Sequence, residues 1–112
     1  MSEDSIWMAL TTVGSETDAK TLANRLVSEG RVACVSILPS VLSIYKWQGV
    51  VENAQEWMLV IKLAQTQRCT LKAHWADLHP YEVPELLMFR VEDGHAPYLN
   101  WVRASAKPES GL

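Results

Sequence analysis

The fold of this chain is decided by residues 32–63, which read VACVSILPSVLSIYKWQGVVENAQEWMLVIKL. Apolar and β-branched residues dominate both halves of this stretch, and Gln48-Gly49 is the first plausible turn between them. The pattern predicts one long β-hairpin. Pro39 cannot donate a hydrogen bond to a neighbouring strand, so it marks a bulge or an edge in the first strand.

This hairpin is too long for one chain to cover. Its first strand, residues 32–47, extends about 50 Å at about 3.3 Å per residue, whereas a compact domain of 112 residues is about 34 Å across. The overhang carries the apolar and aromatic residues Val41, Ile44, Tyr45 and Trp47. Because Lys46 is the only charge between positions 32 and 51, we expect this edge to pair with neighbouring subunits of a closed symmetric oligomer. The alternative is a sharp bend at Pro39 that folds the hairpin back over its own sheet.

Further elements lie on either side of the hairpin. Their apolar patterns predict strands at residues 6–13 and 83–91 and helices at residues 15–30, 66–79 and 97–102. The order is then strand, helix, strand, strand, helix, strand and a short closing helix. It predicts the α+β class, as a ferredoxin-like βαββαβ sandwich with both long helices on one face of the sheet.

The second strand of the hairpin is apolar on both faces. The odd-numbered residues from Trp57 to Leu63 are apolar, and so are Met58 and Val60 between them. Such a strand requires cover on both sides of the sheet. One chain has too few helices to provide it, which is a second reason to expect a homo-oligomer.

Composition is that of an ordinary globular protein, with 48% apolar and 21% charged residues. We expect a single domain over residues 1–112, with its core at about residues 6–104 and a flexible tail at residues 105–112. A net charge of −3 gives no basis for binding nucleic acid or an anionic membrane. The acidic start leads into only a short apolar run, so we expect neither a signal peptide nor a membrane span, and a cytoplasmic location.

Catalytic motifs are missing from the sequence. There is no Gly-rich phosphate loop, nucleophile elbow, CxxC or HExxH, so we do not expect an enzyme. Both cysteines are expected to be thiols in a reducing compartment, with Cys34 packed in the core and Cys69 unreactive near the start of a helix.

Four segments together form a distinctive pattern. They are Val32-Ala33-Cys34-Val35 with Pro39; Ser43-Ile44-Tyr45 with Trp47 and Gly49; His79-Pro80-Tyr81-Glu82-Val83-Pro84-Glu85; and Tyr98-Leu99-Asn100-Trp101. From about residue 6 to residue 104 the chain resembles the CutA family of divalent-cation tolerance proteins. The resemblance implies a ferredoxin-like subunit in a tight homotrimer related in fold to the PII signalling proteins, with the hairpin of residues 32–63 wrapped onto neighbours. It also implies a role in tolerance to divalent metal ions.

Copper binding is a further implication of the resemblance. The bacterial copper pattern has a cysteine in the first strand, a histidine just before the His-Pro-Tyr run and a glutamate after its second proline. Thr11, Leu78 and Glu85 stand at these positions, so two of the three ligand types are replaced. Copper(II) favours imidazole with oxygen donors, and the candidate metal ligands are therefore His79 and Glu85, with Glu82 nearby and a second subunit able to add others. The alternative for His79 is structural: it ends the helix, and its ring binds a carbonyl.

Aromatic residues are concentrated where the resemblance is densest, at Tyr45, Trp47, Tyr81, Tyr98 and Trp101. We expect them to anchor subunit interfaces. The main functional hypothesis is a cytoplasmic homotrimer that binds a divalent cation weakly, copper before zinc, and requires no cofactor. The alternative is a PII-like trimer without a metal function, whose subunit clefts bind a small molecule or a protein.

Overall fold

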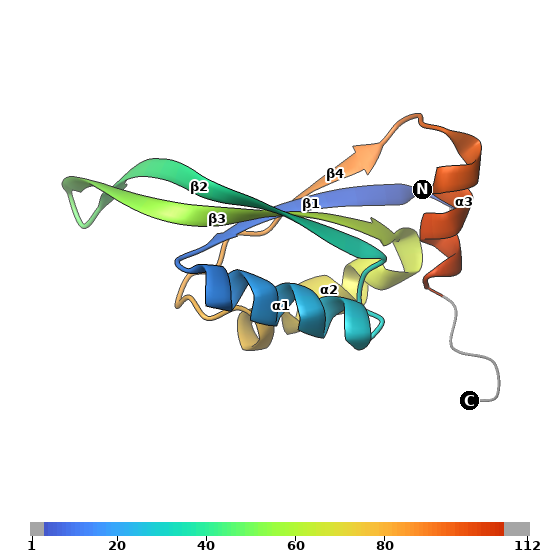
Figure 1. Cartoon of the computed structure of the whole chain (residues 1–112), viewed down its shortest axis with the longest axis horizontal. Helices are drawn as coiled ribbons and strands as arrows, with labels where there is room; N and C mark the ends of the chain where they lie inside the picture. Colours follow the sequence, from blue (N-terminus) through green and yellow to red (C-terminus); the bar gives the residue numbers. More distant parts are fainter. Residues whose placement is uncertain (1–3, 107–112) are drawn as a thin grey trace.

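The computed structural model describes residues 4–106 and shows an α+β fold. Its elements are β1 (Ile6–Val13), α1 (Glu16–Ser28), β2 (Cys34–Trp47), β3 (Val50–Ala64), α2 (Gln65–Leu78), β4 (Leu87–Val91) and α3 (Ala96–Ala104). The four strands form one antiparallel sheet in the order β2-β3-β1-β4. α1 and α2 lie side by side on one face of the sheet, and α3 lies at its end (Figure 1). The predicted order of elements is confirmed.

The long hairpin formed by β2 and β3 is present as predicted. Its strands meet at a two-residue turn in which Gln48 and Gly49 have φ values of 50° and 82°, the positive pair that a tight hairpin turn needs. The register of β2 shifts between Leu38 and Val41, so Pro39 does lie in a bulge, followed by Ser40 with a φ of 58°.

The hairpin projects well beyond the helices (Figure 1). The longest dimension of the molecule is 49 Å, and its radius of gyration is 15.1 Å, above the roughly 13 Å of a compact domain of this length. The alternative of a hairpin folded back at Pro39 is therefore wrong: the bulge redirects the strand without reversing it.

The fourth strand is shorter than predicted. It begins at Leu87 and not at residue 83. Pro84 has no N–H for a ladder, and the carbonyl of Glu85 accepts hydrogen bonds from the side chains of Thr11 and Trp75 instead of from a strand. Residues 83–86 thus form an irregular segment held by side chains. Of the predicted tail, residues 105 and 106 form a turn after α3, and residues 107–112 lie outside the described part.

The core lies between α1, α2 and one face of the sheet. Its fully buried residues include Ala9, Val13, Leu26, Leu59, Ile61, Leu63 and Leu71. On the opposite face, here called the open face, strand alternation places Met8, Leu10, Leu38, Met58, Val60, Leu87 and Phe89. Within residues 4–106 only α3 covers part of it, where Val102 packs against Ile6 and Ala33. The predicted lack of cover on one face is confirmed for the part of the chain that the structure describes.

Candidate functional site

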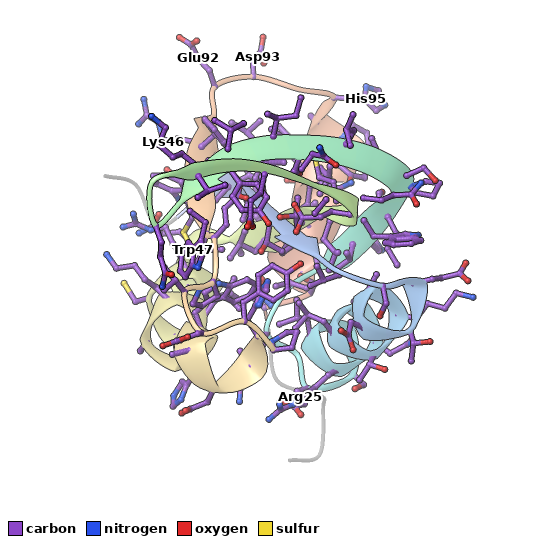
Figure 2. The ribbon with its side chains drawn as sticks, turned by 90° about the vertical axis from the view of Figure 1, so that its left-hand side faces the viewer. Arg25, Lys46, Trp47, Glu92, Asp93 and His95 are labelled. Carbon is purple, nitrogen blue, oxygen red and sulfur yellow. The ribbon has the colours of Figure 1, made fainter. Side chains whose placement is uncertain are left out.

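A groove of about 690 Å³ runs between the overhanging part of the hairpin and the connection from α2 to β4, residues 79–86. The side chains that line this hairpin groove include Tyr45, Trp47, Glu52 and Glu56 from the hairpin and Tyr81, Glu82 and Glu85 from the connection. Figure 2 looks along the hairpin and shows Lys46 and Trp47 on opposite sides of its end, with Trp47 on the helix side. The hairpin groove therefore combines carboxylates with aromatic rings.

His79, the first predicted metal ligand, is buried beneath this groove, with 4% of its surface exposed. Its Nε2 lies 2.9 Å from the carbonyl oxygen of Thr12, and its Nδ1 accepts a hydrogen bond of 3.0 Å from the backbone N–H of Tyr81. Only a neutral ring with the proton on Nε2 makes both bonds. Burial lowers the pKa of His79, and the bond to Thr12 offsets only part of this effect.

The structural role foreseen for His79 is thus what the contacts show. Its backbone N–H donates to the carbonyl of Trp75 at the end of α2, and its ring binds a carbonyl of β1. Both ring nitrogens are occupied. A metal ion binds an imidazole nitrogen through the same lone pair that accepts the Tyr81 N–H, so binding through Nδ1 requires that hydrogen bond to open.

Glu85, the second predicted ligand, lies at the exposed side of the hairpin groove. Its backbone is fixed, because its carbonyl accepts from the hydroxyl of Thr11 at 2.7 Å and from the indole N–H of Trp75 at 3.0 Å. Its carboxylate has one weak contact, 3.4 Å from the hydroxyl of Thr12. The carboxylate is therefore anchored at the backbone and available to a ligand.

The other two positions of the copper pattern are occupied by structural residues. Thr11 is fully buried, and its hydroxyl donates a hydrogen bond to the carbonyl of Glu85. Leu78 is buried in the core at the end of α2. Neither side chain offers a metal a free donor atom.

Sequence reasoning missed a buried acid beside these residues. Glu56 is 8% exposed, and its carboxylate accepts a 2.6 Å hydrogen bond from the hydroxyl of Tyr81. Burial, and then this bond, raise the pKa of Tyr81 well above its ordinary value, so the hydroxyl keeps its proton and remains a donor. A Cβ at Gly14 would lie 3.2 Å from the same hydroxyl. The sequence signal for Glu56 is its position, a single charged residue at the start of the apolar run of β3.

The predicted aromatic set divides into two groups. Tyr45, Trp47 and Tyr81 line the hairpin groove, whereas Tyr98 and Trp101 stack on α3 with ring centres 5.8 Å apart. Cys34 is partly exposed, 3.6 Å from the hydroxyl of Tyr98, so the expectation of core packing is wrong. The reason is that Cys34 points to the open face, where one chain provides little cover.

Within residues 4–106, no three side chains of His, Cys, Asp or Glu lie close enough to hold a metal ion together. The carboxylates of Glu52, Glu56, Glu82 and Glu85 share the lining of one groove without converging on a point. In the same part of the chain, no helix is long and apolar enough to cross a membrane. One copy therefore presents part of a ligand set, with the aromatic rings beside it.

Residues 7–105 match the family model described as CutA1 divalent ion tolerance protein. The chain is 43% identical over 96 residues to the divalent-cation tolerance protein CutA of Thermus thermophilus, covering 86% of this chain and 93% of that protein. It is 37% identical over 99 residues to Protein CutA of Homo sapiens, covering 88% of this chain but 55% of the human protein. The chain thus spans nearly all of the bacterial relative and about half of the human one.

Solved structures agree with these matches. The structure of CutA from Synechococcus elongatus PCC7942 superposes with a TM-score of 0.88 at 33% identity, covering 96% of this chain and 95% of the other. With 96% of this chain covered, the agreement extends over the hairpin, the sheet and the three helices.

Proposed function

This chain belongs to the CutA family of divalent ion tolerance proteins, and from that premise we propose that it acts as a cytoplasmic homotrimer in tolerance to divalent metal ions. In this proposal the trimer binds a divalent cation weakly, copper in preference to zinc, at hairpin grooves completed by neighbouring subunits. The proposal includes no catalytic step, no required cofactor and no nucleic-acid partner. The observation that carries it is the acidic, aromatic hairpin groove, in which residues 4–106 of one copy bring no three ligands together.

Self-association is supported by the apolar surface that one chain leaves exposed. Leu42, Ile44 and Val51 on the hairpin are each about two-thirds exposed, and Leu87 and Phe89 on the open face are about half exposed. Exposed apolar and aromatic side chains gathered on one surface are typical of subunit contacts. A hairpin that packs on a different surface of the next copy makes a head-to-tail contact, and such contacts form a ring when the rotation between copies closes.

The number three and the relation to PII proteins come from the family resemblance. The sheet order β2-β3-β1-β4, with α1 and α2 on one face, supports the ferredoxin-like assignment of the subunit that this resemblance implies (Figure 1).

Metal binding in this proposal starts from Glu85, whose carboxylate is anchored and accessible. Glu82 lies on the same connection, and His79 joins only if the Tyr81 N–H leaves Nδ1. Carboxylates with one hindered imidazole make a weaker copper site than the thiolate and free imidazole they replace. Weak binding is therefore the expected outcome.

Titration calorimetry of the full protein with copper(II) and with zinc(II) tests this site. We expect saturable binding of at most about one ion per chain, stronger for copper. Glu85→Gln should weaken it severalfold. Glu92→Gln is the matched control, because Glu92 lies in the connection from β4 to α3, away from the groove (Figure 2). No saturable binding, or equal binding by both variants, would contradict the site.

The second candidate is a PII-like sensing or scaffold trimer with no metal function. The volume of the groove, about 690 Å³, favours this alternative, because it lies within the range of small-molecule sites. A thermal-shift screen with nucleotides and metabolites in a metal-free buffer separates the two functions. A ligand that binds the native protein raises its melting temperature by mass action. Such a ligand, combined with no response to metal, would favour the second candidate.

A further inference from the structure

A second pocket lies on the helix side of the sheet, between α2 and the edge strand β4, and has a volume of about 330 Å³. We call it the α2-β4 pocket; it is lined by Trp7, Arg68, Lys72, Trp75, Leu86 and Met88. None of these residues takes part in the hairpin groove. The pocket therefore has a lining separate from that of the groove to which the metal function is assigned.

The floor of the α2-β4 pocket is apolar. Trp7 and Trp75 are 8% and 4% exposed, and both indole N–H groups are already used, by the side chain of Gln65 and by the carbonyl of Glu85. Their rings offer surface to a ligand and no hydrogen bond. Leu86 and Met88 continue this surface along the edge of the sheet.

The rim of the pocket is cationic. Arg68 and Lys72 are one turn apart on α2, and neither forms an ion pair with a carboxylate of residues 4–106. Two like charges at this spacing repel each other slightly. Although the net charge of the chain is −3, these two cations have no carboxylate partner among residues 4–106 and lie beside an apolar floor, which is the arrangement expected of a site for an anion.

Arg68 gives the strongest indication of a ligand. Its guanidinium carbon lies 4.2 Å from the centre of the Trp7 ring, so the group is held in place by a cation–π contact. Its Nε is buried and has no hydrogen-bond partner within the described residues. A buried donor without an acceptor is costly. No described side chain is therefore placed to accept from this guanidinium, and next to Lys72 an anionic acceptor fits it best.

We infer that the α2-β4 pocket binds a small organic anion: a carboxylate attached to a planar apolar body. The carboxylate pairs with the guanidinium of Arg68 and with Lys72, while the apolar body packs on Trp75 and Met88. The side chains of the lining offer donors and apolar surface but no carboxylate or amide acceptor. A volume of about 330 Å³ suits a single-ring compound, at the lower end of the range of ligand sites.

Benzoate is the probe, with benzamide as its neutral and benzylamine as its cationic counterpart. Titration calorimetry of the metal-free full chain should give one benzoate per chain, with a Kd of about 1 mM or lower. Benzamide and benzylamine should bind at least about tenfold more weakly. In a two-dimensional nitrogen–proton NMR spectrum, benzoate should shift the indole signals of Trp7 and Trp75.

Variants locate the binding. Arg68→Gln should weaken benzoate binding by about tenfold and Lys72→Gln by severalfold. Lys20→Gln, on the exposed face of α1, is the matched control and should bind as the original chain does. Melting curves show whether Arg68→Gln still folds, and Lys72→Gln tests the site if it does not. Glu85→Gln should not change benzoate binding, so failure of the metal proposal leaves this result unaffected.

Three outcomes would overturn the inference. One is no saturable binding of benzoate up to about 10 mM. Another is binding of benzamide as tight as that of benzoate, or binding that survives both Arg68→Gln and Lys72→Gln. The third is that Arg68→Gln no longer assembles while the original chain does not bind benzoate, which would show that the two cations contact a neighbouring subunit and not a small anion.

Discussion

Replacing Tyr81 by phenylalanine tests the hydrogen bond that closes the inner end of the hairpin groove. The ring and its edge contact with His79 remain, and only the hydroxyl that donates to Glu56 is removed. A hydrogen bond to a charged group contributes about 1.5–3 kcal/mol, and Glu56 is too deeply buried for water to replace the lost donor fully. We expect the free energy of unfolding to fall by about 2 kcal/mol, or the Tm by about 8 °C in a domain of this size.

The assay is urea unfolding at a fixed chain concentration, because assembly makes apparent stability depend on concentration. Tyr98→Phe is the matched control: its hydroxyl lies 3.6 Å from the sulfur of Cys34, and we expect a change below about 0.5 kcal/mol. A double-mutant cycle with Glu56→Gln should give a coupling free energy of about 1 kcal/mol or more. A loss in Tyr81→Phe no larger than in Tyr98→Phe, or additive effects in the cycle, would refute this reasoning.

Three further predictions concern the groove and the hairpin. Burial lowers the pKa of His79 below its ordinary 6.5, so the unfolded chain binds the proton more tightly, and the free energy of unfolding falls as the pH drops through the folded-state pKa. The urea midpoint should therefore be lower at about pH 5 than at about pH 8, and His79→Gln should reduce the difference between the two midpoints. An unchanged difference would contradict this role of His79. Gly14→Ala brings a Cβ within 3.2 Å of the Tyr81 hydroxyl and should cost about 1 kcal/mol, but not in a Tyr81→Phe background, where a persistent cost would place the strain elsewhere. Ile44→Asp places a charge on a hairpin side chain that is 70% exposed in the single chain, so circular dichroism should show an intact fold. Light scattering should show a smaller particle, because the charge weakens the contact between subunits. A particle of unchanged size would show that this part of the hairpin does not form the interface.

The features that the sequence predicted correctly depend on local rules. The turn at Gln48 and Gly49 follows from the backbone conformations that a two-residue hairpin needs, and the bulge follows from the missing N–H of Pro39. The N-terminus of α1 is similar, since Ser15 accepts from the backbone N–H of Asp18 three residues on. In each case the residues that decide the structure are neighbours in the chain.

The features that sequence reasoning missed depend on contacts between distant residues. The ring of His79 binds a carbonyl 67 positions away, and Tyr81 reaches Glu56 across 25 positions. The start of β4 was misplaced because Thr11, in another strand, takes the carbonyl of Glu85. Patterns within a short window carry no information on such pairings, so the sequence predicts single residues of the groove, Glu82, Glu85 and the aromatic residues, but not the groove itself.

Native mass spectrometry of the full chain, with and without copper(II), tests most directly whether neighbouring copies complete the groove that one copy leaves open. The expected species contains three 12.6 kDa chains and takes up copper, with less uptake in Glu85→Gln than in Glu92→Gln. A single 12.6 kDa chain, or a trimer whose copper uptake is the same in both variants, would contradict the proposed function.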